Sequence, residues 1–287
     1  MNFKDLDGNC YSNETSQDRL LKNLYTKIWG RAILKILVSP AISKLGGSVL
    51  NSRLSVPMIK SFIKKNNIDM TQFEERKFKS YNDFFTRKIK QGKRPFSNDE
   101  RVLISPSDSK VSCYKLDDNA SFSIKGTTYS CESLLKSKST AEKFSGGYAF
   151  ILRLSVDDYH RYSYCCSGIK SNNKHIKGKF HTVNPIAFDY YPVFKENTRE
   201  YCLIKSKVFG LVMQMEVGAT MVGKISNLHN DKGIVFKGEE KGKFEFGGST
   251  VVLMVQQGAI QEPKIFLENT YHNCETIIKQ GQTLAIN

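Results

Sequence analysis

Apolar residues are spaced differently in the first and the later parts of the chain. In residues 18–38 they come as pairs repeated every four positions, and this spacing predicts an amphipathic helix that ends at Pro40. Residues 55–65 predict a second, short and basic helix, and Ser80 is a suitable N-cap for a third. The pattern changes near residues 92–95, which have the composition of a turn or linker.

After Val102 the apolar residues form short runs that are separated by glycines and turn residues, a pattern that predicts β-strands. The most apolar of these runs is Tyr148–Leu154, and the last one ends the chain at Thr283–Ile286. One short helix is predicted inside this region, at Cys131–Leu135. We therefore predict an α+β fold in which N-terminal helices are followed by a mainly antiparallel, β-rich body.

The chain is strongly basic, and its formal net charge of +15 indicates attraction to a polyanion, either nucleic acid or an anionic membrane surface. Excess lysine that only keeps the protein soluble is the alternative. We find no recognisable nucleic-acid motif. The predicted helix at residues 18–38 carries Lys27, Arg31 and Lys35 on one face and also holds the only tryptophan. Such a helix is suited to the headgroup layer of an anionic membrane, or it packs on the body of the protein.

Cysteine usage and hydropathy narrow the class of protein further. The seven cysteines are an odd number without C-x-x-C spacing, which argues against a zinc ribbon or a disulfide framework and for a reducing compartment. The polar residues 1–13 do not form a signal peptide, and no apolar run approaches the roughly 20 residues that cross a bilayer. We expect no metal site, because the histidines lack metal-ligand spacing with nearby acids: His160, His175, His181, His229 and His272.

The sequence with the most distinctive chemistry is Phe246-Gly247-Gly248-Ser249-Thr250, which a strand-like run precedes and the apolar run at residues 251–255 follows. Taken alone, it predicts a tight turn between two strands. It also permits a reaction, because a hydroxyl that follows a glycine is able to attack the preceding carbonyl, and glycine tolerates strained backbone conformations. That attack converts the peptide bond before Ser249 into an ester, and elimination of the ester cleaves the chain.

Several separated sequences, in order along the chain, together resemble one family, the phosphatidylserine decarboxylases, which are self-processing pyruvoyl enzymes. The N-terminal helices are similar in character to the membrane-associating region of that family. The matching sequences span roughly residues 75–255 and are Tyr81–Arg87 (YNDFFTR), Ser105–Asp108 (SPSD), Asp158–Arg161 (DYHR), Thr182–Pro185 (TVNP), Val217–Gly223 (VGATMVG) and Phe246–Thr250 (FGGST).

The resemblance implies that the chain is cut between Gly248 and Ser249. Residues 1–248 then become the larger β chain, and residues 249–287 become the α chain, which begins with a pyruvoyl group made from Ser249. It also implies two regions, a membrane-associating helical region at residues 1–75 and a catalytic domain at residues 76–287.

The family uses an aspartate, a histidine and the motif serine for self-cleavage, in keeping with the need of a hydroxyl nucleophile for an oriented base. Asp108 occupies the aspartate position, although a carboxylate after Ser-Pro also serves as a turn former. The family pattern has two histidines three residues apart. His160 matches the first, to which decarboxylation is assigned, and Ser163 replaces the second, to which self-cleavage is assigned.

Three interpretations of Ser163 remain open. In the first, His160 serves both self-cleavage and decarboxylation, which follow one another on the same serine-derived atoms. A general base contributes roughly 10²–10⁴-fold to a rate, and this help is less needed in a self-cleavage that occurs only once. Alternatively, His181, next to the Thr182–Pro185 match, supplies the missing imidazole, or it only makes a structural hydrogen bond. In the third interpretation the protein does not process itself and is not a working decarboxylase.

The resemblance implies the conversion of phosphatidylserine into phosphatidylethanolamine and CO2 through a Schiff base between the substrate amine and the pyruvoyl group, with His160 as the proton donor. One alternative is a pyruvoyl-dependent decarboxylase of a soluble amino acid, and another is an inactive, membrane-binding member of the family. The implied partners are an anionic phospholipid membrane and the two chains of one precursor, and the oligomeric state, such as a homodimer, is left open. The location that this predicts is peripheral, at the cytoplasmic face of the cell membrane.

Overall fold

The structure is a computed structural model of the 287-residue chain. It describes residues 2–12, 23–27, 30, 40–124, 127–179, 181–182, 193–219, 224–245 and 249–287, with the side chains of residues 40–45 excepted.

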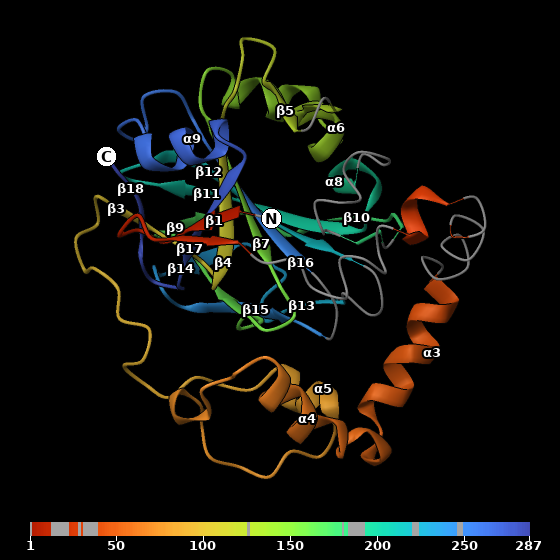
Figure 1. The fold of residues 1–287 in the computed structure, drawn as a ribbon. Coiled ribbons are helices and arrows are strands. Elements are labelled where there is room, and N and C mark those ends of the chain that lie inside the picture. Colours follow the sequence, from red (N-terminus) through yellow and green to blue (C-terminus); the bar gives the residue numbers. More distant parts are fainter. Residues whose placement is uncertain are drawn as a thin grey trace.

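The largest element of the described chain is an 11-stranded sheet (Figure 1), in which all pairs are antiparallel except β1 with β17. This arrangement confirms the predicted α+β class with a mainly antiparallel sheet. The strands follow the order β14 (Gly233–Val235), β9 (Gly168–Lys170), β11 (Arg199–Ser206), β12 (Gly210–Gly218), β16 (Ser249–Val255), β7 (Tyr148–Leu154), β4 (Ser109–Lys115), β17 (Cys274–Ile278), β1 (Asn2–Lys4) and β2 (Cys10–Ser12), and β10 (Lys174–Ile176) also pairs with β11.

Smaller sheets and short helices surround the main sheet. The three-stranded sheet consists of β13 (Ile225–Asn227), β15 (Glu240–Phe244) and β8 (Arg161–Ser163), and the two-stranded sheets are β3 (Val102–Ile104) with β18 (Thr283–Ile286) and β5 (Ser121–Ile124) with β6 (Thr127–Ser130). The helices of the body are α6 (Cys131–Leu135), α7 (Lys138–Ala141), α8 (Val193–Glu196) and α9 (Lys264–Tyr271), with the 3-10 turn η3 (Glu142–Phe144). The predicted helix at Cys131–Leu135 and the predicted strand at Tyr148–Leu154 are both confirmed.

Strand β16 lies in the centre of the sheet, and all seven of its residues are buried because both faces of the strand are covered. Successive side chains point to opposite faces of a sheet. We call the side that carries Ser249, Val251, Leu253 and Val255 the serine face. The three-stranded sheet and α9 cover the serine face with Tyr162, Phe244 and Phe266. The opposite face carries Val252 and Met254, and α6, α8, β5 and β6 cover it.

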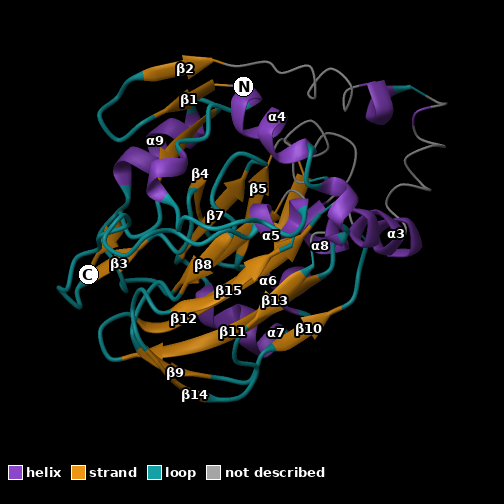
Figure 2. Ribbon diagram, turned by 90° about the horizontal axis from the view of Figure 1, so that it is seen from below, coloured by secondary structure: helices purple, strands orange, loops and turns teal. Residues whose placement is uncertain are grey.

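The N-terminal helices form a separate layer that lies beside β13 and β15 in Figure 1 and, in Figure 2, in front of the strands. They are α3 (Pro40–Asn51), α4 (Met58–Lys65) and α5 (Tyr81–Phe85), with the 3-10 turns η1 (Arg53–Ser55) and η2 (Met70–Gln72). They share a small core of their own, with members from α3, α4 and α5: Leu50, Ile59, Tyr81, Phe84 and Phe85. The predicted basic helix corresponds to α4, and Ser80 caps α5 by accepting a hydrogen bond from the backbone N–H of Asp83.

Most of the predicted helix at residues 18–38 lies outside the described residues. Residues 23–26 within it are helical, and Tyr25 is buried in the core on the opposite face of the sheet. This turn of the helix therefore packs on the body. Among the described residues, no helix has the length and the apolar composition that a membrane crossing requires.

The first twelve residues differ from the helical start that we expected. Strands β1 and β2 form a hairpin, and β1 pairs in parallel with β17 at the edge of the main sheet. The turn is built by Asp5, whose carboxylate accepts hydrogen bonds from the backbone N–H groups of Asp7 and Asn9, and by Gly8 at φ +88°. An Asp turn followed by a glycine in the left-handed region favours a hairpin.

Candidate active site

Ser249 begins the central strand of the main sheet. It pairs with Gly218 of β12 on one side and with Leu154 of β7 on the other, so its backbone is held from both directions. The side chain is fully buried, and within the described chain its Oγ has no hydrogen-bond partner. A buried hydroxyl without a partner is unusual, since most buried polar groups are hydrogen-bonded. The serine is therefore held firmly by its backbone while its hydroxyl remains available for another group.

His160 lies on the side of the sheet toward which Ser249 points. Its backbone carbonyl accepts a hydrogen bond of 2.9 Å from the N–H of Phe244, the last residue of β15, and it directly precedes β8. Two connections thus lead from it to the serine: β7 ends six residues earlier at Leu154, the strand partner of Ser249, and Phe244 is five residues before Ser249. These connections bring the predicted serine and histidine into the same part of the molecule.

The imidazole of His160 is kept neutral by its surroundings. Burial lowers its pKa to about 3, the Asp158 carboxylate opposes this shift, and the positive charge of Arg87 adds to it. Nδ1 lies 2.9 Å from the backbone carbonyl of Asp158, which fixes the proton on Nδ1, and buried Nε2 has no hydrogen-bond partner among the described residues. Phe85 of α5 packs against the ring with centroids 4.0 Å apart. Nε2 therefore has a free lone pair that is able to accept a proton, and the low pKa means that the proton is held only transiently.

Asp108 is buried near this region, but its carboxylate is bound to other groups. Arg94 donates to both of its oxygens, at 2.9 and 2.7 Å, and the backbone N–H of Gln280 donates to Oδ1 at 2.9 Å. Lys279 lies 3.4 Å away. No hydrogen bond between Asp108 and His160 is present in the described structure, so the predicted aspartate does not orient this histidine directly.

Ser163 is buried in β8 and touches the loop that carries Asp108. Its N–H donates to the carbonyl of Pro106 at 2.9 Å, and its own carbonyl accepts a hydrogen bond from Gln214. Pro106, which Ser163 contacts, lies only two residues before Asp108 in the chain. Among the described residues, no hydrogen bond joins the Ser163 side chain to Asp108.

His181 lies on the other side of the sheet. Its ring packs near Tyr25, with centroids 6.5 Å apart, and Tyr25 belongs to the core of the opposite face. Asn197 binds the backbone N–H and carbonyl of His181 and also the carbonyl of Gly218, the strand partner of Ser249. Burial lowers the pKa of His181, and the nearby Glu196 carboxylate opposes the shift. His181 is thus close to the start of β16 along the backbone, but it is not on the serine face.

Arg87 is a residue to which sequence reasoning assigned no role, although it ends the Tyr81–Arg87 match. It is 1 % exposed, and its guanidinium lies 4.2 Å from the ring centre of Phe73 and 4.8 Å from that of Phe84. Its Nε and Nη1 atoms are buried without a hydrogen-bond partner among the described residues. Sequence shows the residue type, but it does not show that a charged side chain is buried here without an ion pair to any described residue.

A second buried polar cluster on the serine face is fully partnered. Glu216 and Lys241 form an ion pair with both side chains inaccessible to solvent. Asn227 accepts a hydrogen bond from Lys241 at 3.0 Å, and Gln214 donates to the backbone of Ser163. Burial alone would lower the pKa of Lys241, but the Glu216 carboxylate more than compensates and raises it. This pair joins β15, which leads to the Ser249 region, to β12, which flanks it.

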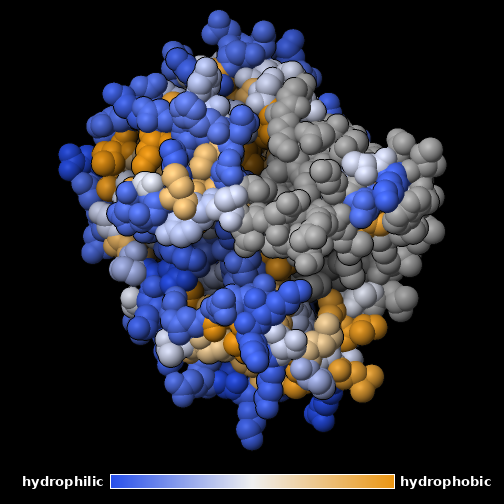
Figure 3. All heavy atoms as spheres, viewed as in Figure 1, coloured by the Kyte–Doolittle hydropathy of each residue, from blue (hydrophilic) through white to orange (hydrophobic). Residues whose placement is uncertain are grey.

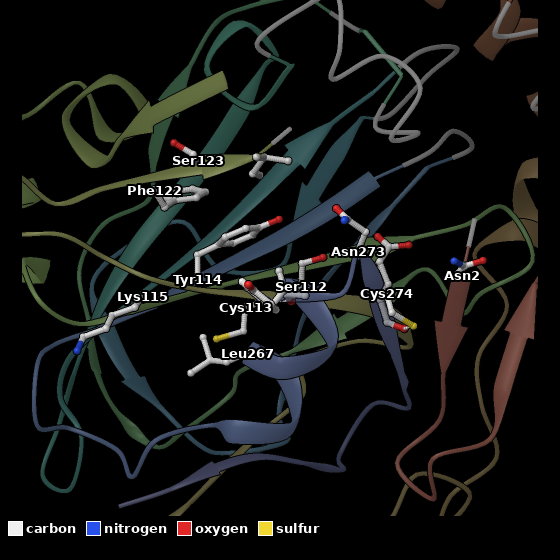
Figure 4. A pocket seen from close by; sticks show the side chains of 14 residues that line it. Asn2, Ser112, Cys113, Tyr114, Lys115, Phe122, Ser123, Leu267, Asn273 and Cys274 are labelled. Carbon is white, nitrogen blue, oxygen red and sulfur yellow. Dashed lines mark hydrogen bonds between the residues drawn. The ribbon is translucent and has the colours of Figure 1, made fainter. Parts of the chain in front are cut away.

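The largest pocket described lies away from these residues (Figure 4). It has a volume of about 730 Å³ and opens between the diverging strands β4 and β17, next to α9 and β5. Tyr114, Phe122, Leu267 and Cys113 line it together with polar side chains. None of the predicted site residues lines this pocket, so its size does not mark the site.

Comparison with known proteins assigns the chain to a class. A sequence model of the family described as phosphatidylserine decarboxylase matches residues 81–285, which is most of the chain. The match covers both the α5 segment and the strand that begins at Ser249.

Individual relatives agree with this class. The chain is 42% identical to phosphatidylserine decarboxylase proenzyme 2 of Clostridium acetobutylicum over 266 residues, covering 92% of this chain and 91% of the relative. It is 39% identical to the phosphatidylserine decarboxylase proenzyme of Clostridium novyi, with 93% and 92% covered, and 39% identical to that of Clostridium kluyveri, with 95% and 94% covered. The chain belongs to the phosphatidylserine decarboxylase family.

Proposed function

We propose that this protein is a phosphatidylserine decarboxylase that activates itself by cleavage between Gly248 and Ser249. The observation that carries the proposal is the buried hydroxyl of Ser249, which lacks a partner among the described residues and points to the side of the sheet where the neutral His160 lies. The family membership supports the same conclusion, because the relatives are named as proenzymes of this decarboxylase. The overall reaction converts phosphatidylserine and a proton into phosphatidylethanolamine and CO2.

In this proposal Ser249 and His160 carry out the self-cleavage. His160 Nε2 accepts the proton of the Ser249 hydroxyl, the oxygen attacks the carbonyl of Gly248, and the peptide bond becomes an ester. The proton passes from His160 to the nitrogen of Ser249, which is released as an amine. Loss of the α-proton then expels the Gly248 carboxylate and leaves dehydroalanine at the start of residues 249–287, and water hydrolyses its imine tautomer to the pyruvoyl ketone with release of ammonia. Asp108 has an indirect role, because it orders the loop that contacts Ser163. His181 is the less favoured base because it packs on the opposite face.

The two chains produced by cleavage would remain together. In the intact sheet, β16 pairs along its whole length with β12 and β7, and β17 pairs with β4 and β1. All of the partner strands belong to residues 1–248, so separation would expose the core on both faces of the sheet. We therefore propose a stable complex of a β chain and an α chain.

The surroundings of Ser249 fit the pyruvoyl group that the family implies. When formed from Ser249, this group supplies the electron sink for loss of CO2. The strands on both sides would hold it in place, and the buried location excludes water. His160 is the residue that would deliver a proton after CO2 leaves. Because its imidazole is neutral at rest, its buried Nε2, which has no partner in the described chain, would first take up that proton from the ammonium group of the substrate.

A membrane surface is the source of the substrate in this proposal. Where α3 meets α4, three apolar side chains are exposed, Leu54 at 88%, Val49 at 55% and Met58 at 51%. This edge appears as the orange atoms at the lower right of Figure 3. Arg53 and Lys60 are exposed beside them. Apolar side chains next to basic ones suit an anionic lipid surface, and Phe85 of the same helical layer contacts His160.

An intact-mass spectrum of the purified protein tests the self-cleavage. We expect two chains that divide between Gly248 and Ser249, the smaller with a pyruvoyl group in place of its N-terminal serine. The Ser249→Ala variant should give one uncut chain, because it lacks the nucleophile. Two chains from Ser249→Ala would contradict the mechanism.

The replacement of the second family histidine by Ser163 favours one competing function, an inactive membrane-binding member of the family. One uncut wild-type chain without decarboxylase activity would establish it. For a cleaved protein, CO2 release from phosphatidylserine vesicles and from free serine separates the lipid decarboxylase from a decarboxylase of soluble amino acids. Activity on free serine alone would contradict our proposal.

A further inference from the structure

Arg87 is a buried cation whose guanidinium has no anionic partner in the described structure. It is 1 % exposed, no ion pair or hydrogen bond joins it to a described side chain, and two of its nitrogens are sealed from solvent without a partner. Burial of an unpaired charge costs free energy, and proteins normally pair such a charge. Burial lowers the pKa of Arg87 to about 10, opposed by Tyr159 and Asp108, so the group is still charged at neutral pH.

The position of Arg87 is fixed by aromatic side chains and by the backbone. The rings of Phe73 and Phe84 lie against the guanidinium, which supplies cation–π attraction but no hydrogen-bond acceptor. The segment around Arg87 is also attached to the His160 segment: Arg161 donates to the carbonyl of Thr86 at 2.9 Å, and Phe85 packs on the ring of His160. The charge is therefore rigidly placed next to the candidate catalytic histidine.

A guanidinium held in this way is preorganised for an oxyanion. Its planar donors match the oxygens of a phosphate or a carboxylate, and burial strengthens the attraction. Comparison with Arg199 shows that the missing partners are not a general feature of buried arginines in this protein. Arg199 is equally buried, and its guanidinium donates four hydrogen bonds to backbone carbonyls.

We propose that Arg87 binds the phosphodiester of the substrate headgroup, an inference that rests on the proposed decarboxylase function. The substrate offers two anions, a phosphodiester and the carboxylate that is lost. Binding the carboxylate would stabilise the ground state with a contact that disappears as CO2 forms, and this would slow the reaction. The phosphodiester keeps its charge throughout, so a contact with it positions the headgroup beside His160 without opposing the chemistry.

The inference is tested by ligand binding to the uncut Ser249→Ala protein, so that the result does not depend on cleavage or catalysis. Calorimetric titrations use glycerophosphoserine, glycerophosphoethanolamine, free serine and inorganic phosphate. We expect Arg87→Met to weaken the binding of both glycerophospho compounds by roughly 30-fold or more, as for the loss of one member of a buried charge pair. Arg87→Lys should recover part of this loss, because it restores the charge without the planar fork.

Arg76→Met is the matched control. Arg76 also lies over an aromatic ring, 5.0 Å from the centre of Phe78, but it is ion-paired with Asp83. We expect its loss to leave the binding of both glycerophospho compounds unchanged. Urea unfolding of each variant identifies a variant that has failed to fold. If Arg87→Met does not fold, the binding of both glycerophospho compounds by Arg87→Lys tests the inference instead.

Three results would overturn the inference. The first is that Arg87→Met binds glycerophosphoethanolamine as tightly as the protein with Arg87 does, and the second is a loss confined to glycerophosphoserine, which would make Arg87 a carboxylate site. The third is that inorganic phosphate binds as tightly as the glycerophospho compounds and depends on Arg87 to the same extent. In the cleavable protein, Arg87→Met should raise KM for phosphatidylserine and change kcat little. A wild type without activity would contradict the proposed function, whereas an active protein whose KM ignores Arg87 would contradict only this inference.

Discussion

The regions around Arg199 and Arg87 both bury a guanidinium group, but they surround it with different partners. Both arginines are 1 % exposed, and burial lowers the pKa of each to about 10. Arg199 at the start of β11 is surrounded by the carbonyls of Ser133, Leu134, Lys195 and Asn197, which end or follow short helices. Arg87 instead faces the rings of Phe73 and Phe84.

The difference shows how a buried polar group can be assigned a role. Where all donors are bound by the protein, as at Arg199 or at the Glu216–Lys241 pair, the group holds elements together. Where donors and acceptors remain unbound among the described residues, as at Arg87, His160 and Ser249, the fold has left them for chemistry or for a ligand. Arg87, His160 and Ser249 belong to segments that meet on the serine face, whereas the hydroxyl of Tyr129, which is also buried without a described partner, lies on the opposite face.

The largest difference between the two arginines should appear in how much their loss lowers the free energy of unfolding. We expect Arg199→Met to lower the free energy of unfolding by about 3–5 kcal/mol, because several buried carbonyls lose their donor. Arg87→Met should change it by less than about 1 kcal/mol or raise it, because no hydrogen bond is lost and an unpaired charge is removed. Urea unfolding of both variants in the Ser249→Ala protein measures this. Equal losses would mean that Arg87 is a structural residue like Arg199.

Disruption of the Glu216–Lys241 pair should have the next largest effect on the free energy of unfolding. Lys241→Met leaves the Glu216 carboxylate buried without its cation, and we expect a loss of about 3 kcal/mol, moderated by the contacts of Glu216 with Gln214 and Asn227. The double variant Glu216→Leu/Lys241→Met should recover most of this loss, since it removes both charges. A double variant that is no more stable than Lys241→Met would show that the pair contributes more than mutual neutralisation.

The unpartnered groups, which are Arg87, His160 and Ser249, should make the free energy of unfolding depend on pH through His160. His160 has a folded pKa of about 3 and an unfolded pKa of about 6.5, so the unfolded state binds more protons between these values. The stability that depends on neutral His160 is complete above pH 6.5, and it falls by up to about 1.4 kcal/mol per pH unit as the pH drops toward 3. Unfolding of the Ser249→Ala protein and of its His160→Gln variant should therefore converge as the pH is lowered from 7 to 4. Parallel curves would mean that His160 is not held neutral.

The smallest effect that we expect is on membrane binding by the exposed apolar edge where α3 meets α4. Replacing Leu54 and Met58 by serine should weaken binding to anionic vesicles by roughly tenfold, because two exposed apolar side chains no longer enter the lipid. The control replaces Ile234 and Phe236, which are similarly exposed at 71% and 64% on and next to the edge strand β14. Co-sedimentation with vesicles measures both. Equal losses from the two pairs would argue against a specific role for the α3–α4 edge.

The sequence by itself determined the fold class, the main strands and the family. Local spacing predicts strands such as β7 and short helices such as α6, because periodicity and turn residues act over a few positions. The motifs also nominate Ser249, Asp108 and His160, since their chemistry is visible in the residue types. The hairpin at residues 2–12 was missed, because its pairing with β17 joins segments at opposite ends of the chain.

Only the tertiary structure decided which of these residues lie together and which are bound by others. Side-chain direction in a sheet depends on register, and register places the Ser249 hydroxyl on the His160 side and His181 on the other. The engagement of Asp108 by Arg94 and the absence of a described partner for Arg87 depend on contacts between distant segments. Hydrogen-bond satisfaction is a property of the packed chain, so no local pattern in the sequence records it.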